Sequence, residues 1–222
     1  LDVVVPPGSR VAVVGASGSG KTTLATLLAG VRTPGAGAVE YDGVPLARLD
    51  ASERGRLVTL VAQETHVFAG TIADNLRLVR PDATDDALRH ALVAVGADAW
   101  VAALPEGIET VVGAGGHPLS PVHGQHLAFA RVQLRDPAVV VLDEATAEAG
   151  SDAARSLDAA ASAVVSGRSA VIVAHRLSQA ASADRILVMA GGEVVESGTH
   201  DELVVAGGTY ARLWRAWTTA AD

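Results

Sequence analysis

The chain has 222 residues, of which 49% are hydrophobic and only 3% aromatic, and its formal charge is -8. This length suits one substantial core, or one core with a smaller lobe, filled mainly by alanine and valine. The acidic balance argues against a broad nucleic-acid surface, the lack of cysteine excludes disulfides and thiolate metal sites, and no apolar run approaches the ~20 residues of a membrane span.

The first predicted strand, Val11–Val14, leads into Gly15–Thr22, which matches the pattern G-x-x-x-x-G-K-[ST]. A helix is predicted to follow, over Thr22–Gly30. Glycines let backbone N–H groups turn toward an anion, and the start of a helix adds unpaired donors and the positive end of a dipole. We therefore predict a phosphate-binding P-loop in which Lys21 reaches the β- and γ-phosphates and Thr22 offers its hydroxyl to Mg²⁺.

Further buried strands and helices alternate along the chain, which predicts an α/β fold with a mostly parallel sheet. The strands are expected at Leu57–Val61, Val139–Leu142, Ala170–Ala174 and Ile186–Met189, and the helices at Asp85–Val95, Gly124–Leu134, Ser151–Val165 and His200–Trp214. Two segments with turn residues, Val39–Val44 and Gly191–Gly198, predict antiparallel additions at the sheet edge.

The region from Thr71 to Arg135 reads as almost wholly helical, and we interpret it as an inserted lobe. The chain is thus expected to be one domain, 1–222, with a P-loop core at 1–70 and 136–222 and a helical subdomain at 71–135. Trp100, Trp214 and Trp217 are interpreted as packing anchors.

Two carboxylates follow the buried strand Val139–Leu142, where ligands gather in α/β proteins. Asp143 is suited to hold Mg²⁺, and Glu144 to orient the water that attacks the γ-phosphate. Another polar pair, His175 and Arg176, follows the strand Ala170–Ala174. His175 is a candidate for a hydrogen bond to the terminal phosphate or to the attacking water.

The order of these motifs resembles the nucleotide-binding domain of ABC (ATP-binding cassette) transporters, particularly of exporters, over nearly the whole chain. The resemblance makes Gly15–Thr23 Walker A, Val139–Glu144 Walker B, His175 the switch histidine and Gln63 the Q-loop glutamine. It implies that ATP and Mg²⁺ are the cofactors. It assigns ATP binding to Gly15, Ser17, Gly18, Ser19, Gly20, Lys21, Thr22, Thr23, Gln63 and Ser120, metal binding to Thr22, Gln63 and Asp143, and catalysis to Glu144, His175, Gln63 and Lys21.

The signature motif departs from the family pattern. Leu119–His123 reads Leu-Ser-Pro-Val-His where the family has Leu-Ser-Gly-Gly-Gln. Ser120 is expected to cap the following helix and Pro121 to occupy its first position, but Pro121 lacks an N–H for the partner's γ-phosphate and Val122 hinders close approach. Gly150 also stands where the family's D-loop has Asp.

In this family two such domains form a head-to-tail dimer, each signature completing the partner's ATP site. Because this signature is degenerate, the expected partner is a non-identical domain with an intact signature, together with the transmembrane domains of a transporter at the cytoplasmic face of the membrane. The chain also lacks the aromatic residue upstream of Walker A that stacks on adenine in exporters. We expect this piece alone to be soluble, weak as an ATPase and not bound to nucleic acid.

Two other interpretations stay open. A regulatory ABC protein would bind ATP and dimerise with little turnover, which the weak signature favours. A cassette ATPase of DNA repair or translation is disfavoured by the acidic balance and by Phe68–Leu76, which resembles the exporter sequence. A kinase would leave Gln63 and His175 unexplained.

Overall fold

The computed structural model describes residues 1–143, 151–174 and 177–221. Contacts along the chain divide it into two compact units. The sheet unit comprises residues 1–60, 138–144 and 167–222, and the helical unit comprises residues 61–137 and 145–166. The helical unit therefore begins before the boundary expected at 71 and also takes in the helix Ser151–Val165.

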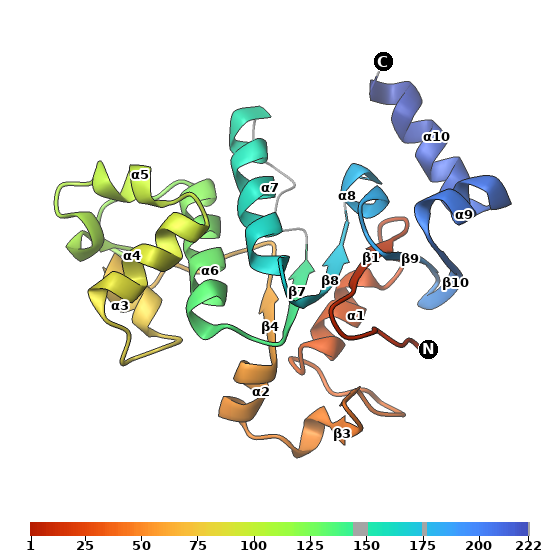
Figure 1. The fold of residues 1–222 in the computed structure, drawn as a ribbon, viewed down its shortest axis with the longest axis horizontal. Helices are drawn as coiled ribbons and strands as arrows, with labels where there is room; N and C mark the ends of the chain where they lie inside the picture. Colours follow the sequence, from red (N-terminus) through yellow and green to blue (C-terminus); the bar gives the residue numbers. More distant parts are fainter. Residues whose placement is uncertain (144–150, 175–176, 222) are drawn as a thin grey trace. The chain divides into compact units, whose positions relative to one another are not determined.

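A mostly parallel sheet forms the centre of the sheet unit (Figure 1). Its strands lie in the order β10-β9-β1-β8-β7-β4; β1 pairs with β8 and β9 in parallel, β7 with β8 in parallel, and β10 with β9 antiparallel. The strands are β1 (Arg10–Val14), β4 (Val58–Val61), β7 (Val139–Asp143), β8 (Ser169–Val173), β9 (Arg185–Ala190) and β10 (Glu193–Gly198). The α/β fold predicted from the sequence is confirmed.

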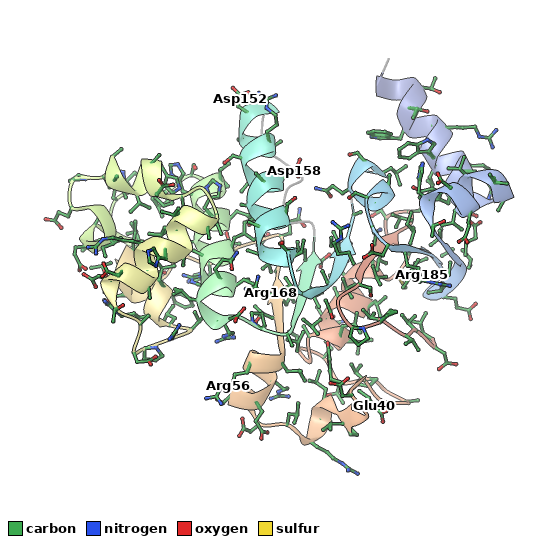
Figure 2. All side chains as sticks on the ribbon, viewed as in Figure 1. Glu40, Arg56, Asp152, Asp158, Arg168 and Arg185 are labelled. Carbon is green, nitrogen blue, oxygen red and sulfur yellow. The ribbon has the colours of Figure 1, made fainter. Side chains whose placement is uncertain are left out.

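Helices and a small hairpin complete the sheet unit. They are α1 (Lys21–Leu28), β2 (Glu40–Tyr41), β3 (Val44–Pro45), η1 (Leu46–Arg48), α2 (Ala51–Leu57), α8 (Leu177–Ala181), α9 (His200–Ala206) and α10 (Thr209–Ala221). The expected antiparallel segments appear as the β2–β3 hairpin and as β10. Figure 2 shows Arg185 at the start of β9, where its Nε donates to Ser197 Oγ of β10 at 2.7 Å.

The side chains of β1 point alternately into two buried clusters, one on each face of the sheet. Val11 and Val13 belong to one buried cluster, which includes residues of α1, whereas Ala12 and Val14 belong to a second cluster, which includes Tyr210 of α10. Successive strand side chains point to opposite faces, so a strand covered on both sides must be apolar at every position. This explains the uninterrupted valine and alanine run that precedes the P-loop.

The helical unit contains β5 (Gly70–Thr71), α3 (Ile72–Arg77), α4 (Asp85–Ala94), α5 (Asp98–Ala102), η2 (Gly107–Glu109), β6 (Val111–Val112), α6 (Pro121–Arg135) and α7 (Ser151–Val165). Arg131 of α6 joins three parts of this unit: its guanidinium donates to the backbone oxygens of His66 and Asn75 and to Asn75 Oδ1, at 2.8–3.0 Å. In the described ranges, none of the helices combines the length and the apolar composition needed to cross a bilayer.

The prediction of one continuous helix from His200 to Trp214 was wrong. The chain forms α9 and α10 instead, because Gly207 ends α9 in a left-handed conformation with φ of 67°. Glycine adopts this conformation without the penalty that a Cβ atom imposes, and it commonly ends helices. The break lets α10 take its own direction (Figure 1).

A carboxylate from the neighbouring strand anchors the start of α10. Glu196 of β10 accepts hydrogen bonds from the backbone N–H groups of Thr209 and Tyr210. Burial raises the pKa of Glu196, but the hydrogen bonds from Tyr210 and Thr209, aided by the charge of Arg212, outweigh burial and lower the pKa. His200 Nδ1 also lies 2.8 Å from the hydroxyl of Tyr210, so two polar contacts hold the first turn.

We predict that Glu196→Ala lowers the free energy of unfolding by about 0.5–2 kcal/mol at pH 7, as loss of a helix N-cap does. Because the native-state pKa is lowered, this stabilisation is complete above the ordinary glutamate value of about 4.3 and is lost as the pH falls through the native pKa. Denaturant titrations of the wild type and the variant at several pH values measure the difference.

Glu193→Ala, an exposed position on the same strand, is the matched control and should change little. Glu196→Gln keeps an acceptor oxygen without the charge, so it should lose less stability than Glu196→Ala and remove this pH dependence. An Ala variant as stable as the wild type at pH 7 would show that the carboxylate does not hold α10.

Candidate nucleotide-binding site

The P-loop connects Val14, the last residue of β1, to Lys21, the first residue of α1. The path of its backbone requires glycine at two positions. At Gly15, where φ is 153°, a Cβ atom would lie 2.3 Å from the backbone oxygen of Met189, so no larger residue fits. Gly20 caps α1 in a left-handed conformation with φ of 100°. The loop therefore passes close to β9 before it turns into the helix.

The start of α1 offers backbone donors. Its first helical hydrogen bond runs from Leu24 N to Gly20 O at 2.9 Å, so the N–H groups of residues 21–23 have no partner within the helix. These groups and the helix dipole make the turn a binding site for an anion.

Lys21 lies inside this loop. The side chain is only 8% exposed, and its Nζ donates to the backbone oxygens of Gly15 at 2.8 Å and Ala16 at 3.0 Å. The ammonium is thus held within the turn that the backbone donors surround. Lys21 is also the only lysine among the 222 residues, the other cationic side chains being arginines and histidines.

The sheet register brings the other strand ends to the same edge. Asp143 is paired with Val173, and Val173 is paired with Val13 of β1, two residues before Gly15, where the P-loop begins. The carboxyl end of β8 therefore lies between those of β1 and β7, and the arrows of β7 and β8 point to the same side in Figure 1. Asp143 is 5% exposed, at the end of β7.

Asp143 and Thr22 meet across this edge. Thr22 Oγ1 donates to Asp143 Oδ1 at 3.4 Å, joining the first turn of α1 to the end of β7. Among the described residues there is no cluster of three or more His, Cys, Asp or Glu side chains able to hold a metal alone. Mg²⁺ commonly takes one or two protein oxygens and completes its shell with phosphate and water. A hydroxyl beside one carboxylate fits that requirement.

A cavity of about 540 Å³ opens over the P-loop. This volume lies within the usual range for small-molecule sites. Its lining includes the P-loop glycines together with Lys21 and Thr22, which are the groups suited to phosphate and to a metal bound to it. The residues present thus fit a nucleoside triphosphate with Mg²⁺.

The signature segment lies in the helical unit, where Ser120 caps α6. Its side chain accepts a hydrogen bond from His123 N at 3.2 Å, and Pro121 occupies the first turn, which confirms both local predictions. The ring of His123 stacks on Trp100, with 4.3 Å between centroids and 11° between planes. Burial, with a smaller effect of the His117 charge, lowers the pKa of His123. An uncharged ring packed within its own unit therefore occupies the place of the family's glutamine.

The roles of Gln63, Glu144 and His175 stay predictions. Gln63 follows β4 with an exposed side chain, in the helical unit, and its role toward the metal stays a prediction. Glu144 and His175 lie outside the described residues, as does Gly150 of the D-loop segment. Their roles also stay predictions.

Sequence reasoning missed part of the cavity wall. Leu177 of α8 and both Leu213 and Trp217 of α10 line the cavity together with the P-loop. Trp217 had been interpreted only as a packing anchor. No motif marks these residues, because they come from two helices roughly 150 to 200 positions away in the sequence and enter the site through the fold alone.

Comparison with known proteins identifies the family. Residues 1–147 match the family model described as ABC transporter. The ATP-dependent lipid A-core flippase of Chromobacterium violaceum is 40% identical over 213 residues, which are 96% of this chain and 36% of the flippase. The mitochondrial potassium channel ATP-binding subunit of Xenopus tropicalis is 42% identical over 97% of this chain and 31% of its own length.

A multidrug efflux ATP-binding/permease protein of Mycobacterium bovis is 42% identical over 98% of this chain and 18% of its own length. The chain thus spans about a third or less of the length of these curated relatives.

Because Lys21 is the only lysine, its reactivity reports directly on the P-loop. We predict that ATP with Mg²⁺ slows acylation of Lys21 by an amine-selective reagent at least tenfold, since a phosphate would cover Nζ. Mass spectrometry measures the modified fraction, and the chain's α-amino group serves as the internal reference. Equal rates of Lys21 acylation with and without saturating nucleotide would contradict the phosphate-binding role.

Proposed function

This chain belongs to the ABC transporter family, and we propose that it serves as the ATP-hydrolysing motor domain of an exporter. The observation that carries the proposal is the meeting of three features at one sheet edge: the P-loop, its buried Lys21 and the Thr22–Asp143 pair. The assignment to an exporter is supported by relatives named as a lipid flippase and as a multidrug efflux protein.

Each polar group has a proposed task in hydrolysis. Lys21 and the first-turn N–H groups hold the phosphates, so the reacting γ-phosphate is fixed before water attacks. Thr22 and Asp143 would hold Mg²⁺, which when bound would neutralise charge on the phosphate oxygens. Glu144 is proposed to position and polarise the water, with Gln63 assigned to the metal and His175 to the γ-phosphate.

The second ATP-binding surface is proposed to come from another domain. Pro121 has no N–H to donate at the first position of α6, and His123 is stacked on Trp100. Both observations support a signature that contributes little to a partner's ATP. We propose a heterodimer in which the partner's intact signature completes the site on this chain, beneath the membrane domains of the transporter and on the cytoplasmic side.

We predict that the wild-type chain alone hydrolyses ATP slowly and gains tenfold to hundredfold activity when mixed with its Pro121→Gly/Val122→Gly variant. The variant regains one backbone donor, and a charge-assisted hydrogen bond is worth about 1.5–3 kcal/mol. Phosphate release measures the rate, with thermal melts to confirm folding. Pro121→Ala restores the N–H without the glycines and separates the two causes. Vigorous cooperative turnover by the wild type alone would refute the degenerate-signature proposal.

We predict that Glu144→Gln slows hydrolysis in the active mixture by at least a hundredfold while ATP affinity stays within threefold, because general-base catalysis contributes about 10²–10⁴. The measurements are phosphate release and equilibrium ATP binding. Glu148→Gln, which removes a carboxylate four positions away, is the control and should retain activity. Normal turnover by Glu144→Gln would assign the water-activating role to another group.

The second candidate is a regulatory ABC protein that binds ATP with little turnover. The stacking of His123 on Trp100 and the proline at the start of α6 favour it, since neither feature helps to complete a partner's site. The two candidates differ in the mixing experiment. A regulatory protein would still bind ATP and would gain no turnover when an intact signature is supplied.

A further inference from the structure

The cavity over the P-loop has two chemically different walls. One part of its lining is the glycine-rich loop with Lys21 and Thr22, which suits phosphate. Another part is apolar and includes Leu177, Leu213 and Trp217; these three residues are called the apolar wall. A nucleotide has the same division, because it carries anionic phosphates at one end and a flat aromatic base at the other.

The apolar wall is held in place. Leu213 and Trp217 are four residues apart in α10, so they share one face of that helix. The start of α10 is anchored by Glu196 and by the contact between His200 and Tyr210. These contacts fix the first turn of the helix whose later turns carry Leu213 and Trp217.

Aromatic packing continues this support along the helix. Trp214 packs against the core that contains Tyr210, with its ring stacked on Tyr210 at 6.4 Å between centroids. Trp217 follows, with its ring centroid 5.2 Å from that of Trp214. Trp214 is therefore the packing anchor of α10, whereas Trp217 lines the cavity one turn further on and remains partly exposed.

We propose that Trp217, supported by Leu213, is a specificity-determining residue that packs against the base of the nucleotide whose phosphates bind the P-loop. The proposal rests on the ATP-binding function proposed above. Stacking on an aromatic side chain is tolerant of base identity and contributes most where water is excluded. Trp217 should therefore favour nucleotides over inorganic polyphosphates and discriminate only weakly between adenine and guanine.

The test compares two ligands that share the phosphates and differ in the base: Mg²⁺ with ATP, and Mg²⁺ with inorganic tripolyphosphate. Calorimetric titrations use the 222-residue wild type, Trp217→Ala and Trp217→Phe. Trp100→Phe, which alters a tryptophan of the helical unit, is the control. Thermal melts establish that each variant is folded.

We expect Trp217→Ala to weaken ATP binding fivefold to hundredfold and to leave tripolyphosphate affinity unchanged, because only the base loses its partner. Trp217→Phe should retain most of the ATP affinity. Leu213→Ala should weaken ATP binding by a smaller factor and should also leave tripolyphosphate affinity unchanged. This variant tests the proposal if Trp217→Ala does not fold.

Three results would overturn the assignment. Unchanged ATP affinity in Trp217→Ala would mean that the indole does not contact the base. An equal loss for both ligands would mean that it only supports the P-loop, and a gain for both would mean that α10 obstructs the site. If the wild type binds tripolyphosphate but not ATP, the role of the apolar wall is refuted while the phosphate site stands. If it binds neither ligand, the proposed function fails, and this inference fails with it.

Discussion

The structure of the site depends on the parallel register of β1, β7 and β8. This register brings the carboxyl ends of β1, β8 and β7 to one edge, with β8 between the other two, and Asp143 of β7 lies within hydrogen-bond distance of Thr22 on the helix that follows the P-loop. A shift of one residue in either pairing would turn Asp143 to the other face of the sheet. These strands are apolar on both faces, as a sheet covered by a core on each side requires.

The backbone of the P-loop is already arranged to bind phosphate before any ligand arrives. Gly15 and Gly20 adopt backbone conformations and close approaches that other residues do not tolerate, and Lys21 is already folded into the turn. Lys21 must exchange its bonds to two backbone oxygens for bonds to phosphate, so part of its binding energy is spent on that exchange. Preorganisation of the backbone donors compensates, because they need no rearrangement.

The sequence predicted the local parts of this picture well. Strand and helix periods placed the sheet, the P-loop pattern placed Lys21 and Thr22, and the Ser120 cap followed from residue types at the start of a helix. It failed where the answer depends on distant parts of the chain. Gly207 divides a helix that looked continuous, and its effect on the direction of α10 is tertiary. Trp217 reaches the cavity only through that direction, so no spacing rule could find it.

The central claim is that the Lys21 loop binds the triphosphate, with Mg²⁺ held at Thr22 and Asp143. A crystal structure of the chain with Mg²⁺ and a non-cleavable ATP analogue tests it most directly. We expect Lys21 Nζ to leave the oxygens of Gly15 and Ala16 for the phosphates, with the metal bound by Thr22. A Lys21 still bonded to both backbone oxygens, with the analogue absent from the loop or bound elsewhere, would contradict it.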